Sequence, residues 1–304
     1  MTKTETKSCY ITVFWLGDRR AGVKEAQVDR LFYLKTHLSH LSSYSHDLTD
    51  IYLVFNLEEE HHKYLPEIKK ITPDKIQNAN VNIVIRENKG MSYGAWSDVA
   101  KVHKDRYDYY IFNEDDYYFV QDNWDKYLVD KFNTYPDAGY VCPFIEEPHE
   151  LSGYSKWAGS SVGISSGKVL NKVLSRFGEL PHSGGNDYKQ GESSQIAFSY
   201  AFIKVGYNIY DIRDEYRAIL ANTGINMMDF DKHFYWNDNH LVVPALWITL
   251  AQAGETHTWW TSTTAQFTSH HKNSTVEEAE ACREQKLMIE HLRDSRDYKY
   301  DYST

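Results

Sequence analysis

The first half of the chain contains short, almost fully apolar runs separated by longer stretches of mixed polarity. Three of these runs are rich in aromatic and β-branched residues, as buried strands are: Cys9 to Leu16, Asp50 to Leu57 and Val81 to Asn88. A fourth run, Tyr107 to Phe112, consists almost wholly of tyrosine, isoleucine and phenylalanine. We therefore predict four strands of one buried sheet.

Helical patterns separate these strands. Leucines recur at helical spacing between the first two runs, at positions 31, 34, 38 and 41. A charged helical stretch near Glu58 to Lys70 ends before Pro73, and Lys89 with Gly90 opens a turn that leads into another helix. Strands that alternate with helices require right-handed crossovers, so the pattern predicts an α/β fold with a mainly parallel, doubly wound sheet.

The second half continues this alternation and then loses it. We predict a helix at "NWDKYLVDKF", a strand over Ala138 to Phe144, a small-residue strand and a helix within "KWAGSSVGISSGKVLNKVL", a loop at "HSGGNDYKQGESS", and then helix and strand up to residue 212. From Arg213 the signals weaken. We expect a core over residues 1–220 and a C-terminal extension, 221–304, packed on the same domain, with a polar tail after about residue 293.

Composition narrows the class of protein. The 304 residues carry a formal net charge of −10, opposite to the basic surface that nucleic-acid binding needs, although a local basic groove remains compatible. The three cysteines have no zinc-site or disulfide spacing and are read as small buried hydrophobes in a reducing compartment. The amino terminus lacks the apolar core of a signal peptide, and no apolar run is long enough to cross a bilayer. We expect a cytoplasmic protein.

Three acids follow the tyrosine-rich run directly: Glu114, Asp115 and Asp116. In open α/β sheets, ligands collect at the carboxyl ends of the strands. Clustered carboxylates at such a place repel one another unless a positive charge lies among them, and a divalent cation is the simplest partner. The alternative is a solvated acidic turn without a ligand.

Four segments together resemble the GT-A glycosyltransferases, which use nucleotide-sugar donors. They are the first strand with its polar turn, the segment Arg86 to Gly90 leading into "GAWSD", the acids of "NEDD", and "GESSQIAFSYAFIKVGY" at Gly191 to Tyr207. Their order spans about the first two thirds of the chain. The resemblance implies a Rossmann-like GT-A fold with a C-terminal acceptor-side extension.

The resemblance also implies a metal site with Mn²⁺ or Mg²⁺. The triplet departs from the usual D-x-D motif and is similar to the E-D-D variant of Golgi N-acetylglucosaminyltransferases, in which the last acid, here Asp116, is the direct metal ligand. Glu114 and Asp115 would then lie near the ribose or sugar and support the ion, with Asp115 also a candidate ligand. Many members add a histidine near the carboxyl end, for which His240 is the candidate among five.

A catalytic base is the second implied role. Inverting members place a carboxylate at the start of the helix before a Gly-Tyr strand entry, and Glu192 occupies that position, with Asp187 in reserve. A base there takes the proton of the acceptor hydroxyl. A helix-starting acid without chemistry is the competing interpretation, and a retaining enzyme would not need this base.

Contacts with the donor and acceptor are predicted from the shared edge of the sheet. The candidate nucleotide-binding residues follow the first three strands: Asp18, Arg19, Asn56 or Glu58, Asn88, Lys89 and Gly90. The candidate acceptor-binding residues lie in the small-residue strand: Trp157, Gly159 and Ser160. Loop residues that cap helices, solvated turn cations and a core tryptophan would produce the same pattern.

These features favour a metal-dependent glycosyltransferase that moves a sugar from a nucleotide-sugar donor to the hydroxyl of a saccharide, glycolipid or small molecule. The alternatives are a phage-type enzyme that glycosylates a hydroxylated DNA base, a non-catalytic sugar-nucleotide or glycan-binding module, and a metal-dependent phosphohydrolase or nuclease. No P-loop, zinc signature or nucleophile-elbow motif competes with them.

Overall fold

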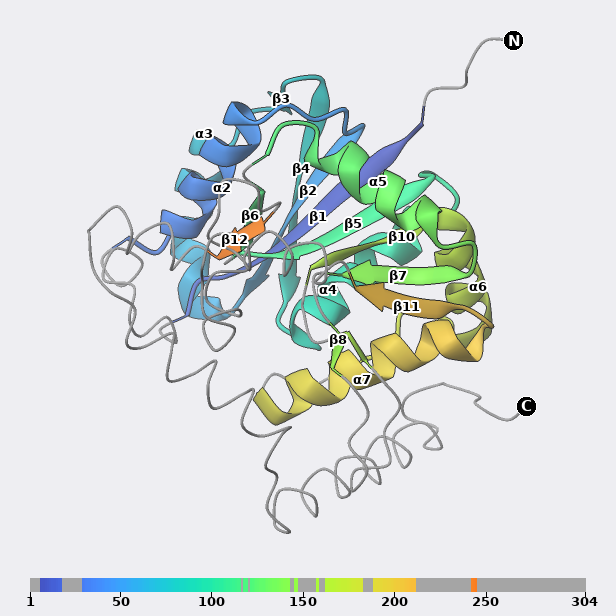
Figure 1. Cartoon of the computed structure of the whole chain (residues 1–304). Helices are drawn as coiled ribbons and strands as arrows, with labels where there is room; N and C mark the ends of the chain where they lie inside the picture. The colour runs from blue at the N-terminus through green and yellow to red at the C-terminus, as the bar shows by residue number, and fades with distance from the viewer. Residues whose placement is uncertain are drawn as a thin grey trace, which may run out of the picture.

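A computed structural model of the chain describes residues 6–17, 29–115, 117–119, 121–142, 145–146, 157–158, 162–182, 188–211 and 242–244. These residues form an α/β fold with one large sheet between two layers of helices (Figure 1). The predicted fold class is therefore confirmed. The predicted division at residue 220 remains untested, since most of residues 221–304 lie outside the described part.

The central sheet has eight strands in the order β11-β7-β10-β5-β1-β2-β4-β3. Four parallel neighbours form its middle: β5 (Tyr109–Glu114), β1 (Ser8–Trp15), β2 (Asp50–Leu57) and β4 (Ala79–Glu87). Every residue of β2 is buried, and in β1 only Trp15 is half-buried. Strands covered on both faces read as continuous apolar runs, which explains why the sequence located them so closely.

The flanks of the sheet contain antiparallel pairs. β10 (Gly163–Ser166) lies antiparallel between β5 and β7 (Ala138–Cys142), and β11 (Asn208–Asp211) pairs parallel with β7. At the other end, β3 (Lys75–Ile76) pairs antiparallel with β4. The sheet is thus mostly parallel, as predicted, with two reversed strands, β10 and β3, that the sequence pattern did not reveal.

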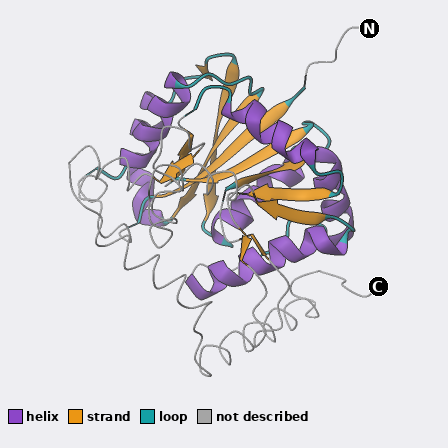
Figure 2. Ribbon diagram, viewed as in Figure 1, coloured by secondary structure: helices purple, strands orange, loops and turns teal. Residues whose placement is uncertain are grey.

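Helices cover both faces of the sheet, as Figure 2 shows. One layer contains α2 (Phe32–Ser43), the short η1 (Glu59–Tyr64) with α3 (Leu65–Ile71), and α5 (Trp124–Thr134). The other contains α4 (Met91–Val102), α6 (Gly167–Phe177) and α7 (Tyr188–Lys204). Crossovers on one face followed by crossovers on the other make the sheet doubly wound.

Two small sheets lie outside the central one. β8 (Ile145–Glu146) pairs with β9 (Trp157–Ala158), and β6 (Tyr117–Phe119) pairs antiparallel with β12 (Val242–Pro244). The second pair brings a segment more than 120 residues distant in sequence beside the strand that follows the three acids.

One predicted loop is partly wrong. The stretch "HSGGNDYKQGESS" was assigned to a loop for its glycines and serines, but α7 begins at Tyr188 and includes its second half. Helix α7 packs against α4, where the ring of Phe198 lies 5.3 Å from that of Tyr93 and 5.9 Å from that of Trp96. This packing outweighs the weak local preference of glycine and serine.

Cys9 and Cys142 are buried and form no disulfide within the described residues, as predicted for small buried hydrophobes. Cys282 lies outside them. Across the described ranges, none of the helices has the length and apolar character needed to cross a membrane.

Candidate active site

The order of strands reverses beside β1. The chain first adds β2 and β4 on one side of β1 and then places β5 on its other side. In doubly wound sheets, the crevice at the carboxyl ends of the strands on either side of this reversal is the ligand-binding position. Register aligns Val13 with Glu114 and Trp15 with Asn56 at this edge. Two of the three predicted acids, Glu114 and Asp115, therefore lie at the switch point of the sheet.

The acids form a tight connection between β5 and β6. Glu114 is the last residue of β5, Asp115 lies in the turn, and Tyr117 begins β6. The strand ends two residues later than the sequence predicted, so Glu114 belongs to the sheet. Asp116, the predicted metal ligand, lies outside the described residues.

The side chain of Asn113 holds this turn from within. Its amide nitrogen lies 2.8 Å from the carbonyl oxygen of Glu114 and 2.8 Å from that of Tyr117. The carbonyl oxygen of Asn113 itself accepts a hydrogen bond from the indole N–H of Trp96 on α4, at 3.3 Å. Asn113 and Trp96 are fully buried, so these bonds form in a dry environment where leaving a carbonyl unpaired would be costly.

His37 of α2 holds the remaining carbonyl. Its Nε2 donates to the carbonyl oxygen of Asp115 at 3.1 Å, and its Nδ1 lies 3.4 Å from the hydroxyl of Tyr10 on β1. Burial lowers the pKa of His37 from 6.5 to about 3, so the ring is neutral. Because a carbonyl only accepts, the proton lies on Nε2 and Nδ1 accepts from the tyrosine.

The carboxylates of the turn accept hydrogen bonds from two neighbouring elements. Glu114 accepts from the hydroxyl of Ser92, in the first turn of α4, at 2.5 Å. Asp115 is 2 % exposed and accepts from the backbone N–H of Trp15 at 3.2 Å. The amino end of a helix favours negative charge, so α4 stabilises the ionised form of Glu114. Both acids thus have fixed side-chain positions.

The turn between β4 and α4 is held by Arg86. Its guanidinium donates to Asn56 Oδ1 at 2.7 Å, to the carbonyl oxygen of Lys89 at 2.8 Å and to Asp98 at 2.8 Å. Asn56 is buried and its Nδ2 donates to the carbonyl oxygen of Met91 at 3.1 Å. Asn56, a predicted nucleotide contact, is therefore used to position this turn at the same edge as the acids.

Gly90 is required by packing. Its φ is +72°, and a Cβ added there would lie 2.3 Å from the ring of His182. Met91 follows with φ at +52°, an uncommon conformation for a residue with a side chain. Two left-handed residues in succession let the chain reverse sharply into α4. Gly90 was predicted to approach a phosphate, but the side of Gly90 where a Cβ would point is filled by the imidazole of His182.

The other residues predicted near the nucleotide differ in their surroundings. The side chain of Lys89 is 67 % exposed and lies 2.8 Å from Glu87, which is a solvated ion pair. Asn88 has a buried Oδ1 that finds no hydrogen-bond partner within the described part of the chain. Glu58 starts η1 as a capping box with His61, whose Nδ1 accepts from the Glu58 N–H at 3.4 Å. Glu58 and His61 also belong, with Glu60, to a cluster of side chains whose ligand atoms lie within 4.8 Å of one another.

Several predicted site residues cannot be placed. Those outside the described residues are Asp18, Arg19, Asp116, Gly159, Ser160, Asp187 and His240. Trp157 lies in β9, and Glu192 is the fifth residue of α7. The helix dipole acts most strongly in the first turn of a helix. Because α7 begins four residues before Glu192, Glu192 lies beyond that turn. The dipole of α7 therefore stabilises a charge on Glu192 less than the sequence predicted.

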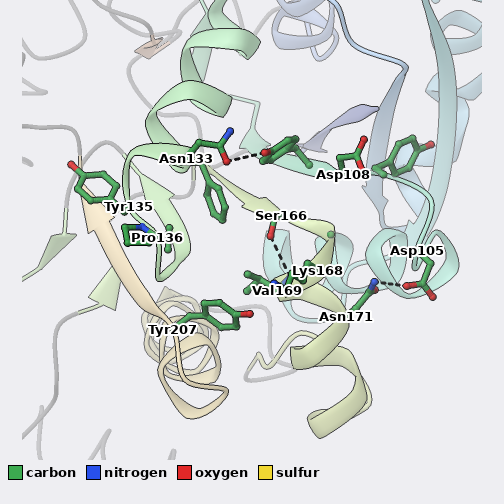
Figure 3. Close-up of a pocket in the computed structure, with 15 residues that line it drawn as sticks. Asp105, Asp108, Asn133, Tyr135, Pro136, Ser166, Lys168, Val169, Asn171 and Tyr207 are labelled. Atoms are coloured by element: carbon green, nitrogen blue, oxygen red, sulfur yellow. Dashed lines mark hydrogen bonds between the residues drawn. The ribbon is translucent and has the colours of Figure 1, made fainter. Parts of the chain in front are cut away.

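A hollow of about 710 Å³ lies at the opposite edge of the sheet (Figure 3). Its polar groups mostly hold one another: the hydroxyl of Tyr109 donates to Asn133 at 2.9 Å, Asn171 bonds Asp105, and Ser166 caps α6. These bonds join β5 to α5 and the loop before β5 to α6. We interpret this hollow as a structural seam between elements, separate from the switch point.

The described donor set fits a divalent cation. Carboxylate oxygens such as those of Glu114 and Asp115 are the ligands that Mg²⁺ and Mn²⁺ prefer. The buried side chain of Asp115 faces Trp15, which suits support of an ion better than direct ligation.

Sequence reasoning missed the residues that hold the acidic turn. Ser92 and Trp96 lie in the predicted "MSYGAWSD" helix, and Asn113 precedes the acids, but no motif distinguished their roles. His37 carried one signal, since a histidine interrupts the leucine face of α2 between Leu34 and Leu41. A polar residue on an apolar helix face needs a buried partner.

No protein-family model and no curated protein sequence matches the chain. Solved structures with a similar fold include a CMP:2-keto-3-deoxy-manno-octonic acid synthetase with CTP (TM-score 0.41, 11% identity, covering 72% of this chain and 100% of that one). A cytidylyltransferase from Leptospira borgpetersenii has a TM-score of 0.41 and 11% identity over 90% and 99% of the chains. A 4-diphosphocytidyl-2C-methyl-D-erythritol synthase from Anaerococcus prevotii has 0.38 and 9% over 68% and 88%. Likeness at this level carries no inference about activity.

Proposed function

We propose that the protein is a metal-dependent glycosyltransferase that uses a nucleotide-sugar donor. The observation that carries the proposal is the acidic turn at the switch point of the sheet, where four carbonyls and two carboxylates are held by side chains and backbone of β1, β5, α2 and α4. Catalytic groups work best when their positions are fixed before the substrate arrives. A solvated acidic turn without a function would not need such support.

The proposed roles are those that the resemblance to GT-A glycosyltransferases implies. Asp116 holds a Mn²⁺ or Mg²⁺ ion, and Glu114 and Asp115 orient the ribose or sugar and the ion's surroundings. When bound, the cation neutralises negative charge on the departing diphosphate. Glu192 takes the proton from the acceptor hydroxyl, with Asp187 as the alternative base. Trp157, Gly159 and Ser160 are the proposed acceptor contacts, and the acidic composition favours a saccharide or other small hydroxyl acceptor.

A thermal-shift screen tests the donor and the metal together. UDP-, GDP-, CMP- and dTDP-linked sugars are added to the full chain with Mn²⁺ and, separately, with a chelator. We expect one nucleotide class to raise Tm by several degrees only when Mn²⁺ is present, because a ligand that binds the native state stabilises it. If every donor is silent with Mn²⁺ present, the proposed donor class is wrong.

Product analysis then separates transfer from the alternatives. The donor found in the screen is incubated with a panel of saccharide acceptors, and both glycoside and free sugar are quantified. Glu192→Gln is expected to lower transfer by about 100-fold or more while leaving donor binding unchanged. A variant that transfers at the parental rate would remove Glu192 from the mechanism, and donor binding without any transfer would favour a binding module.

A further inference from the structure

The imidazole of His37 belongs to none of the proposed chemical roles, yet it contacts the acidic turn directly. It is 1 % exposed and lies on the buried face of α2 with Tyr33, Leu34 and Leu41. Its ring packs edge-on against Phe14 at 5.2 Å and Tyr118 at 4.6 Å between centroids. The ring can therefore neither rotate nor exchange its partner for water.

The bond to Asp115 acts on the peptide between two acids. The carbonyl that accepts from Nε2 belongs to the peptide unit that joins Asp115 to Asp116. A peptide is planar, so a hydrogen bond to its oxygen restricts the rotation of the whole peptide unit. Asn113 donates to the carbonyls of Glu114 and Tyr117, and His37 donates to the carbonyl of Asp115, which lies between them in the chain.

The Tyr10 hydroxyl selects the tautomer that can do this. Its oxygen lies 2.5 Å from the amide nitrogen of Asn113, which donates to it, so the tyrosine proton is left to bind Nδ1 of His37. A ring protonated on Nδ1 alone could not donate to the carbonyl of Asp115. The series Asn113, Tyr10, His37, Asp115 thus has one consistent direction of donation.

We propose that His37 is a positioning residue: through its Nε2–H it holds the carbonyl of Asp115 and so orients the turn that contains Glu114 and Asp115 for a divalent cation. The part that concerns the cation rests on the proposed function. The part that concerns the turn rests on the contacts alone. In many metal sites, a histidine that binds the metal donates its other ring N–H to a neighbouring group, which fixes the ring. Here the imidazole would bind no metal and would act through a backbone carbonyl.

Three variants of the full chain test the proposal. His37→Phe keeps a ring and removes the donor, whereas His37→Gln returns an N–H close to the place of Nε2. Leu41→Ala is the matched control, since it weakens the same face of α2 one turn away without touching the turn. Unfolding in urea measures the stability of each, so that effects on the turn can be compared at equal loss of stability.

The first readout needs no metal. Nitrogen NMR of the parent should find His37 protonated on Nε2 only; a ring protonated on Nδ1 overturns the proposal. Hydrogen exchange of the amides of residues 114–117 should be about tenfold faster in His37→Phe than in Leu41→Ala, and should return toward the parent in His37→Gln. Equal exchange in His37→Phe and Leu41→Ala would show a packing role only and would also overturn it.

The second readout uses Mn²⁺ alone, titrated by its electron paramagnetic resonance signal. We expect about tenfold weaker binding in His37→Phe, recovery in His37→Gln and parental affinity in Leu41→Ala. Parental affinity in His37→Phe overturns the role in cation binding. If the parent itself binds no Mn²⁺ while the tautomer and exchange results hold, the positioning of the turn stands and the metal part of the proposed function fails.

Discussion

The two edges of the central sheet both contain buried acids, but different groups hold these acids at each edge. At the amino edge, Asp50 is 1 % exposed and accepts from Tyr107 at 2.6 Å, from Arg106 at 3.0 Å and from Asn80 at 3.0 Å. Its charge is matched by a guanidinium of the same chain. At the carboxyl edge, Glu114 accepts from the hydroxyl of Ser92 and Asp115 accepts from the backbone N–H of Trp15.

This difference teaches what each edge is for. A carboxylate with a cationic partner and several donors joins β2 to the segment before β5, and its interactions are complete within the fold. At the carboxyl edge, the hydroxyl of Ser92 and the backbone N–H of Trp15 hold Glu114 and Asp115 at the end of the sheet where doubly wound folds bind their ligands. We therefore expect substitutions at the amino edge to change stability and those at the carboxyl edge to change activity.

The largest expected effect is at the carboxyl edge. Asp116→Asn should lower transfer at saturating Mn²⁺ by about 100-fold, roughly 2.7 kcal/mol of transition-state stabilisation, because the cation loses its charged ligand. The melting temperature should change little. Initial rates with the donor from the screen and a melting curve of the same preparation measure both. Turnover equal to that of the parent would contradict the proposed metal site.

The opposite result is expected at the amino edge. Asp50→Asn should cost about 2 kcal/mol of unfolding free energy in urea, since Arg106 and Tyr107 lose their charged acceptor. Transfer per folded molecule should remain at the parental level. Unchanged stability, or a loss of turnover in fully folded protein, would show that the two edges are not separate in function.

The cost of Asp50→Asn should also depend on pH. Burial alone would raise the pKa of Asp50, but hydrogen bonds from Tyr107 and Asn80 and the charge of Arg106 outweigh it and hold the pKa below its usual 3.8. The stabilisation is therefore present above pH 3.8 and lost as pH falls through the pKa of the folded protein. Urea unfolding at a series of pH values should show the difference between parent and variant closing below about pH 4.

A smaller effect, on both stability and donor binding, is expected in the turn before α4. Arg86→Lys should cost about 1 kcal/mol, because an ammonium cannot reproduce the three-sided contact of the guanidinium with Asn56, Asp98 and Lys89. It should also weaken donor binding in the thermal-shift assay. Lys89→Ala is the control and should change stability by less than about 0.5 kcal/mol, as an exposed ion pair does. Equal costs for the two variants would show that Arg86 does not hold the turn.

The success of the sequence predictions differs between the strands and the loops. The predicted strand over Asp50 to Leu57 coincides with β2, and the helix at "NWDKYLVDKF" coincides closely with α5. Both elements bury a strong apolar pattern. The stretch before Glu192 was misread because its glycines and serines are weak local signals, and packing of α7 on α4 decided its conformation.

The candidate site divides in the same way. The position of Glu114 and Asp115 at the carboxyl edge followed from the order of strands and helices, because parallel strands end together. The roles of Asn56 and Gly90 did not follow, since the sequence could not show that Arg86 and His182 lie against them. Asn56 and Gly90 help to shape the turn before α4, and their predicted contacts with a nucleotide stay predictions.

The sequence by itself determined that a buried parallel sheet forms and that an acidic triplet closes one of its central strands, because hydrophobic periodicity and strand endings are local properties. Only the tertiary structure decided which acid meets Arg106, which carbonyl meets His37 and which strand lies reversed between β5 and β7. These pairings join residues far apart in the chain, and their energies come from burial and hydrogen-bond geometry that arise only when the elements pack.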